Sequence, residues 1–164
     1  MDSIDKFNKL SKTEFISIFG NIFEKTEWIA ERCYESKPYN NFDELVSKMM
    51  KIFENIEKER HLEILNSHPD LAVEKKLTKD SINEQKNASL NQCTDEEFME
   101  FKKLNEEYKK KFAFPFIIAV KGKNKEEILN SFRQRIANNI NLEFIEAKKQ
   151  VKKIASFRLR EIIK

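Results

Sequence analysis

The stretch TDEEFMEFKKLNEEYKKKF, residues 94–112, decides the class of fold that we expect for this chain. It opens with Thr94 and Glu97 at the spacing of a capping box, which marks the start of a helix. Apolar side chains then recur at helical spacing through a charged exterior. These side chains are Phe98, Phe101, Leu104, Tyr108 and Phe112. The pattern predicts an amphipathic helix that turns all five inward and stops before Pro115.

The same signals recur on both sides of this helix. Capping boxes pair Ser11 with Glu14 and Asn124 with Glu127, and Asn41 and Asn141 are placed to cap two further helices. The first of these patterns leads into an apolar stripe of Phe15, Ile18, Phe19, Ile22 and Phe23, and the helix expected after Asn41 carries Phe42, Leu45, Met49, Phe53 and Ile56. The chain has only two glycines and three prolines. We therefore predict an all-α fold, a single-domain irregular bundle of about seven or eight helices over residues 1–164.

One stretch departs from the helical pattern. FAFPFIIAVKG, residues 112–122, is a nearly continuous apolar run that contains a proline and is closed by a glycine. A lone strand would have no partner in a helical chain, so we predict an extended segment, Phe114 to Val120, that crosses the core. Its buried N–H and C=O groups would need partners outside regular structure, and a bound polar ligand is one way to supply them.

Composition excludes several classes of protein. Of the 164 residues 40% are hydrophobic and 36% charged, and 31 basic against 28 acidic residues leave a net charge of only +3. Both signs are interspersed, as on a solvated surface, so we expect no nucleic-acid partner. The N-terminus lacks the apolar core of a signal peptide, and no run is long enough to span a membrane. Neither the two cysteines nor the two histidines have ligand spacing, so we expect a cytoplasmic protein without a metal site.

The segment LNSHPDLA, residues 65–72, places a histidine directly before a proline. Pro69 biases His68 to extended geometry, and Pro69 with Asp70 suits the first turn of a new helix. One interpretation is therefore a junction between two helices, with Asp70 favoured by the helix dipole. The other is that His68 is a reagent, because histidine titrates near neutral pH.

Two further features carry the same ambiguity. SINEQ, residues 81–85, fits a capping box, yet Glu84 and Gln85 place a carboxylate beside an amide, which suits a ligand rich in N–H groups. Arg158 falls within an apolar arc of the last helix, whereas Arg160 falls outside it. An arginine on that arc needs either an internal ion pair or an anionic or carbonyl-bearing ligand.

These segments together resemble the OHCU decarboxylases, the 2-oxo-4-hydroxy-4-carboxy-5-ureidoimidazoline decarboxylases of urate breakdown. The resemblance runs almost end to end and rests on HPDLA, then S-x-x-E-Q, then F-x-F-P-F-I-I, in this order and spacing. Val73 and Glu74 depart from the glycine and basic residue that commonly follow HPDLA in the family, and Tyr39 stands where phenylalanine is usual. The resemblance implies an all-helical carboxy-lyase that is commonly dimeric, uses no cofactor and gives (S)-allantoin in purine catabolism.

The resemblance also implies a set of site residues. The essential histidine, regarded as the proton donor, corresponds to His68, and the catalytic glutamate and arginine correspond to Glu84 and Arg158. The substrate-binding positions correspond to Pro69, Ser81, Ile82, Asn83, Glu84, Gln85, Phe116, Ile117, Ile118, Ala119 and Val120. The segment from Phe116 to Val120 is expected to contribute backbone contacts.

Two other functions stay open at the level of sequence. One is a catalytically idle helical interaction module that keeps the fold alone, although the joint presence of His68, Glu84, Gln85 and Arg158 disfavours it. The other is a decarboxylase of a related ureido acid, because backbone contacts do not identify the ligand that they bind.

Overall fold

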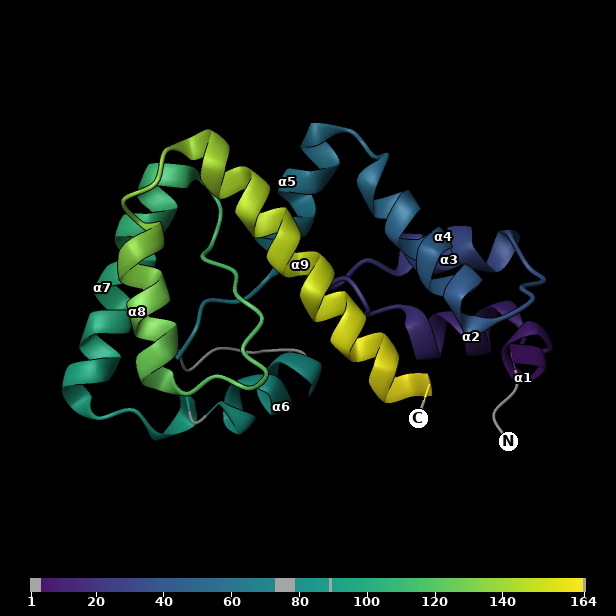
Figure 1. Cartoon of the computed structure of the whole chain (residues 1–164), viewed down its shortest axis with the longest axis horizontal. Helices are drawn as coiled ribbons and strands as arrows, with labels where there is room; N and C mark the ends of the chain where they lie inside the picture. Colours follow the sequence, from purple (N-terminus) through teal and green to yellow (C-terminus); the bar gives the residue numbers. More distant parts are fainter. Residues whose placement is uncertain (1–3, 73–78, 89, 164) are drawn as a thin grey trace. The chain divides into compact units, whose positions relative to one another are not determined.

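The computed structural model describes residues 4–72, 79–88 and 90–163, and these ranges contain nine α-helices, one short 3-10 helix and no strand. The α-helices, labelled in Figure 1, are α1 (Ile4–Asn8), α2 (Lys12–Phe19), α3 (Glu27–Glu35), α4 (Phe42–Glu54), α5 (Lys58–Ser67), α6 (Lys79–Asn87), α7 (Asp95–Phe112), α8 (Lys125–Arg135) and α9 (Ile140–Ile163). The 3-10 helix η1 (Leu90–Gln92) lies between α6 and α7 in the sequence. The predicted all-α class is confirmed, with nine α-helices in place of seven or eight. Val73 and Glu74 lie outside the described residues. None of the described helices combines the length and apolar character needed to cross a membrane.

The chain divides into two compact units. Unit 1 comprises Met1–Ile64 and Lys152–Lys164, and unit 2 comprises Leu65–Val151. Helix α9 contributes its first half to unit 2 and its second half to unit 1. A single domain over residues 1–164 stays a prediction.

In unit 1, α2 and α4 begin where their caps predict. Ser11 Oγ accepts a hydrogen bond from the Glu14 N–H at 3.2 Å, and Asn41 Oδ1 accepts one from the Glu44 N–H at 2.9 Å. Helix α2 is shorter than its apolar stripe suggests, because it ends at a glycine, which is a poor helix former. The last two residues of the stripe, Ile22 and Phe23, are buried but lie beyond α2, and Ile18 is exposed, so the predicted continuous helical stripe is wrong.

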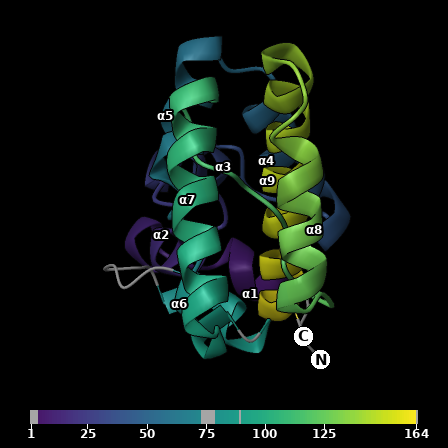
Figure 2. The same cartoon turned by 90° about the vertical axis from the view of Figure 1, so that its left-hand side faces the viewer.

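In unit 2, α7 and α8 lie side by side and run in the same direction (Figure 2). Their starts are again capped as predicted, by Thr94 and by Asn124. Phe98 is 38% exposed, so its predicted inward orientation is wrong. At about 100° per residue it lies at the edge of the arc that is centred on Phe101, Tyr108 and Phe112.

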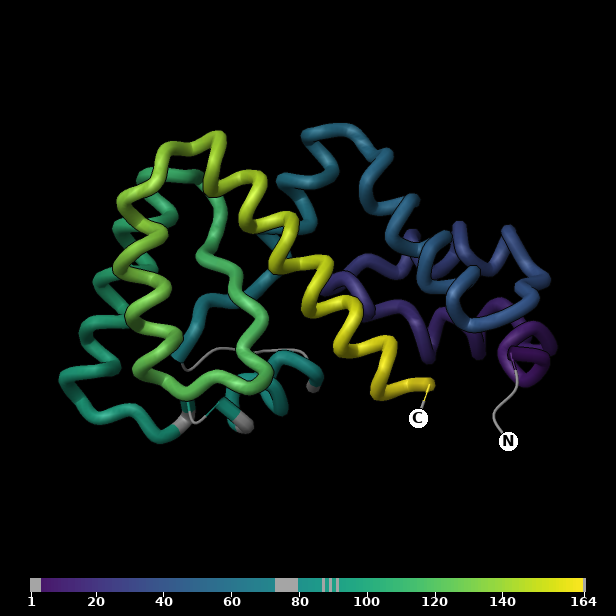
Figure 3. Tube along the Cα trace, viewed as in Figure 1, coloured from purple at the N-terminus to yellow at the C-terminus, as the bar shows by residue number. Residues whose placement is uncertain are grey.

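The segment between α7 and α8 returns the chain from the end of one helix to the start of the other (Figure 3). As predicted, residues 115–120 form neither helix nor strand, and the side chains from Phe114 to Val120 are buried. The segment ends in a turn in which the Lys123 N–H donates to the Val120 carbonyl at 3.0 Å. Gly122 adopts a φ of 78° in this turn, a conformation that glycine tolerates best.

Helix α9 begins at Ile140, and not after a cap at Asn141 as predicted. The Leu142 N–H donates to Asn139 Oδ1 at 2.9 Å, so Asn139 and not Asn141 provides the cap. The orientation of the helix agrees with the sequence pattern, because Arg158 is buried and Arg160 is exposed.

Candidate active site

His68 directly follows α5 and is only 8% exposed. Its backbone N–H donates to the carbonyl of Leu65 at 3.2 Å. The predicted helix start at Pro69 and Asp70 is wrong, because residues 69–72 are not helical. Ala72 has a φ of 55°, and this left-handed conformation cannot continue a right-handed helix.

The side chain of Gln85 binds the backbone of this segment from α6. Its Oε1 accepts a hydrogen bond from the Ala72 N–H at 3.1 Å, and its Nε2 donates to the Asp70 carbonyl at 3.3 Å. Gln85 thus replaces two of the backbone hydrogen bonds that a helix would have supplied. The contact also brings the HPDLA and SINEQ segments together, through hydrogen bonds between residues 13 and 15 positions apart in the sequence.

Helix α7 holds the same segment from another side. Asn105 Nδ2 donates to the Leu71 carbonyl at 3.1 Å, and Lys109 Nζ lies 2.7 Å from a carboxylate oxygen of Asp70. Asn105 is buried, so its hydrogen bond is shielded from water. The backbone that carries His68 is therefore fixed by polar side chains from two helices.

The SINEQ residues divide between two faces of α6. Ser81 and Gln85, four positions apart, are buried, whereas Ile82 and Asn83 are exposed and Glu84 is half-buried. Helix α6 already includes Lys79, so Ser81 is not its N-cap and the capping-box interpretation is wrong.

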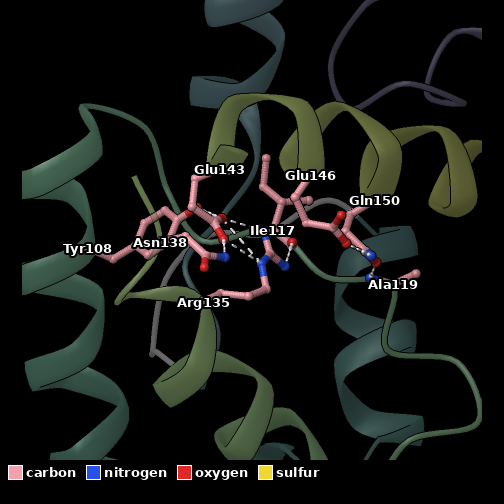
Figure 4. Close-up of polar contacts among 8 residues, drawn as sticks. All are labelled: Tyr108, Ile117, Ala119, Arg135, Asn138, Glu143, Glu146 and Gln150. Atoms are coloured by element: carbon pink, nitrogen blue, oxygen red, sulfur yellow. Dashed lines mark hydrogen bonds and ion pairs between the residues drawn. The ribbon is translucent and has the colours of Figure 1, made fainter. Parts of the chain in front are cut away.

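The extended segment is held by side chains from α8 and α9 (Figure 4). Arg135 Nη1 donates to the Ile117 carbonyl at 2.7 Å, and the Ala119 N–H donates to Gln150 Oε1 at 3.0 Å. Gln150 Nε2 in turn donates to a carboxylate oxygen of Glu146 at 2.8 Å. Two of the backbone groups that were predicted to contact substrate thus have partners within the protein.

A buried network fixes Arg135 itself. Its guanidinium lies 2.9 Å from Glu143, which is fully buried and also accepts hydrogen bonds from the Tyr108 hydroxyl at 2.5 Å and Asn138 Nδ2 at 3.1 Å (Figure 4). The guanidinium also packs over the ring of Phe116. Burial, followed by the hydrogen bond to Glu143, raises the pKa of Tyr108 well above its usual value, so its hydroxyl remains a donor.

Arg158 belongs to unit 1, where it has protein partners. Its Nη2 donates to a carboxylate oxygen of Glu24 at 2.8 Å, and its Nη1 donates to the Asn21 carbonyl at 2.7 Å. The side chains of Arg158 and Glu24 are 5% and 0% exposed. The internal ion pair that the sequence left open is therefore present.

Sequence reasoning missed five residues that support these segments. They are Asn105, Lys109, Arg135, Glu143 and Gln150. The last two could have been found by the helical-wheel argument that singled out Arg158, because both lie within a turn or two of the buried Ala147 on α9. Arg135 carries no such signal, because its helix ends there and its partner Ile117 lies 18 residues earlier.

Within the described ranges, no three histidine, cysteine, aspartate or glutamate side chains gather into a group that could hold a metal ion.

Comparison with known proteins gives one consistent result. The model of the OHCU decarboxylase family matches residues 8–160. The chain is 41% identical to a uric acid degradation bifunctional protein from Bacillus sp. (strain TB-90), over all of this chain but only 33% of that protein. It is 35% identical to a 2-oxo-4-hydroxy-4-carboxy-5-ureidoimidazoline decarboxylase from Haloferax volcanii, over 97% of this chain and 95% of that protein. The crystal structure of an (S)-allantoin synthase matches all of this chain and 54% of its own, with a TM-score of 0.80 at 27% identity. The chain thus spans about a third of the first of these relatives and nearly all of the second.

Proposed function

The chain belongs to the OHCU decarboxylase family, and we propose that it converts 2-oxo-4-hydroxy-4-carboxy-5-ureidoimidazoline (OHCU) to (S)-allantoin without a cofactor. The observation that carries this proposal is the pair of hydrogen bonds from Gln85 to the segment after His68. They join the proposed proton donor to the proposed substrate-binding helix within unit 2. The extended segment belongs to the same unit.

The substrate explains why the reaction needs no cofactor. Its carboxylate is attached to a ring carbon next to an imine. When CO2 leaves, the electron pair forms a carbon–carbon double bond, and the imine electrons move to the ring nitrogen, which takes up a proton. The substrate is therefore its own electron sink. A proton delivered to one face of the former imine carbon, with loss of the neighbouring hydroxyl proton, then gives a single enantiomer of allantoin. The protein has to orient the carboxylate, stabilise the developing charge and deliver that proton.

Three side chains divide this work. His68 acts on the hydroxyl and carboxylate end and then protonates the intermediate, a role worth roughly 10²–10⁴-fold for a well-placed histidine. Glu84 accepts hydrogen bonds from ureido N–H groups. Arg158 donates to substrate oxygen with a guanidinium whose orientation Glu24 fixes.

The remaining positions bind the substrate. Ser81 and Gln85 contribute from the buried face of α6, and the segment from Phe116 to Val120 contributes backbone donors and acceptors. The same role is proposed for Pro69, Ile82 and Asn83, which the family resemblance implies.

The activity can be tested directly. OHCU is generated in situ from urate with the two enzymes that precede it, this protein is added, and the optical activity of the product is followed. We expect rapid appearance of (S)-allantoin. His68→Asn should reduce turnover to the background rate while helicity and melting temperature stay near those of the parent. Slow racemic product with the parent protein would refute the function, and near-normal turnover by His68→Asn would remove that residue from the mechanism.

We further propose that the protein works in the cytoplasm as a homodimer. The support for both is the family resemblance described above. A solution mass near twice that of the 19.6 kDa chain is expected from light scattering, and a mass equal to one chain would contradict the dimer.

A further inference from the structure

Residues 21–26, in the loop between α2 and α3, provide two groups that bind the guanidinium of Arg158. Nη1 donates to the Asn21 carbonyl at 2.7 Å, and Nη2 donates to a carboxylate oxygen of Glu24 at 2.8 Å. The loop and Arg158 belong to the same unit. A guanidinium is planar, so contacts at two of its nitrogens fix the orientation of the whole group. The loop therefore determines how Arg158 is presented.

Hydrogen bonds and a ring contact hold the backbone of this loop in one conformation. Asn21 Oδ1 accepts a hydrogen bond from the Lys25 N–H at 2.9 Å. Thr26 stands at the N-cap position of α3, but its hydroxyl donates to the Phe23 carbonyl in place of capping the helix. The ring of Phe23 is stacked on that of Phe53 in α4, with the centroids 4.7 Å apart. The loop is thus anchored at several points along its length.

Lys25 is the strained position of the loop. Its φ of 54° lies in the left-handed region, which residues with a side chain rarely adopt. The Lys25 side chain is exposed, while Glu24 before it and Thr26 after it are buried, so contacts of the lysine side chain do not explain the conformation. Strained backbone that its surroundings enforce is common at functional sites. Here it directly follows one of the residues that bind Arg158.

We propose that Asn21 and the left-handed Lys25 are positioning residues that hold Arg158 in the geometry needed for the decarboxylation. This inference rests on the proposed function and adds to Glu24 the loop that carries it. Asn21 acts twice, because its carbonyl binds the guanidinium and its side chain binds the Lys25 N–H. Helices α2 and α3 pack together and fix both ends of the loop. A different φ at Lys25 must therefore be absorbed by residues 21–24, which carry the two acceptors for Arg158.

Two substitutions at Lys25 separate the backbone conformation from the side chain. Glycine adopts the left-handed region readily and β-branched valine does not, and neither change removes a buried side chain. We expect kcat for OHCU to be about tenfold lower in Lys25→Val than in Lys25→Gly, with KM values within about threefold of each other. The KM values stay close because a displaced Arg158 keeps its charge. The kcat falls because the substrate oxygen is no longer held in the reacting geometry.

Variants at Asn21 test the other half of the arrangement. Asn21→Ala removes the acceptor for the Lys25 N–H but keeps the carbonyl that binds Arg158. We expect kcat to fall about tenfold, and Asn21→Asp, which restores the acceptor, should recover most of the loss. A purely structural role predicts a different result, in which Asn21→Ala lowers the melting temperature but keeps the parental kcat when the rate is measured well below it.

The guanidinium gives a readout that does not depend on turnover. The chain has six arginines, and in protein labelled with ¹⁵N-arginine the signals of Arg158 are identified by their loss in Arg158→Lys. Because the two acceptors hinder rotation about the bonds from Cζ to Nη1 and Nη2, we expect separate Nη signals in the parent and in Lys25→Gly. In Lys25→Val and Asn21→Ala these signals should merge.

The possible failures are distinguishable. Where the parent protein turns over OHCU, three results would each overturn the positioning role and leave the proposed function intact. These are equal kcat in Lys25→Gly and Lys25→Val, parental kcat in a folded Asn21→Ala variant, and unchanged Nη signals in Lys25→Val. If Asn21→Ala does not fold, the pair of variants at the exposed Lys25 decides the question. If the parent does not turn over OHCU, the proposed function fails and this inference fails with it.

Discussion

At the scale of single residues, Arg158 shows how one guanidinium can satisfy two kinds of acceptor. One nitrogen binds a carboxylate of Glu24 and another binds a main-chain carbonyl. Such a forked geometry is specific to arginine, because the ammonium of lysine is a single point charge. The sequence alone predicted that Arg158 is buried, but it could not choose between a ligand and a protein partner.

Arg158→Lys is expected to lower kcat/KM for OHCU and to reduce the free energy of unfolding by roughly 1–3 kcal/mol, because a buried acceptor loses its donor. The rate should be measured well below the melting temperature, so that unfolding does not account for the loss. Arg160→Lys is the control, since Arg160 is exposed on the same helix and should tolerate the change. Parental kcat/KM in Arg158→Lys would exclude Arg158 from substrate orientation.

At the scale of elements, a helix was predicted to begin at Pro69, but the segment after His68 is instead held by side chains of α6 and α7. We call these side chains, Gln85, Asn105 and Lys109, the HPDLA clamp. Residues 69–72 are not helical, and side chains of α6 and α7 bind their backbone instead. The position of His68 therefore depends on helices that follow it in the sequence. Asn105 in α7 tests this dependence, because it lies outside the predicted set of substrate-binding residues.

Asn105→Leu should lower kcat about tenfold with little change in KM, because the backbone next to His68 loses its support while α6 is intact. It should also reduce the free energy of unfolding by about 1–3 kcal/mol, since the Leu71 carbonyl is left without its donor. Lys102→Leu, on the exposed side of α7, serves as the control. Parental kcat in a folded Asn105→Leu variant would argue against the clamp.

The helix starts at Ser11, Thr94 and Asn124 were more predictable from the sequence than the supports of the site. The caps at Ser11, Thr94 and Asn124 depend on residues three positions away, so the local sequence contains the whole signal. The bond between Asn105 and Leu71 joins residues 34 positions apart, and no periodicity records such a pairing. The sequence therefore located the HPDLA segment but not the side chains that hold it.

At the scale of the whole molecule, several carboxylates make the protein sensitive to acid. Their pKa values are lowered from the usual 4.5, chiefly by hydrogen bonds that each accepts from a neighbouring side chain or backbone N–H. The four groups are Glu14, Glu44, Glu97 and Glu100. Glu97 pairs with Lys125 and Glu100 with Arg133, so two of these carboxylates join α7 to α8.

A group whose pKa is lower in the folded state stabilises the protein above its unfolded pKa, and the contribution is lost as the pH falls through the folded value. The free energy of unfolding in urea should therefore decline from about pH 4.5 downward. The double variant Glu97→Gln with Glu100→Gln should be less stable than the parent at neutral pH and should lose less stability in acid. Identical pH dependence in parent and variant would show that these two pairs do not contribute.

The division of the chain also determines the order in which the contacts of each unit become available during synthesis. Unit 2 is one continuous stretch, so every residue it needs has left the ribosome once Val151 has emerged. Unit 1 is interrupted. Arg158 follows Glu24 by 134 positions and must be translated before that buried pair can form. Until then the ion pair between Glu24 and Arg158 is absent. A nascent chain that ends before residue 152 would therefore contain all the residues of the HPDLA clamp. Its unit 1 would still lack the second half of α9, which begins at Lys152.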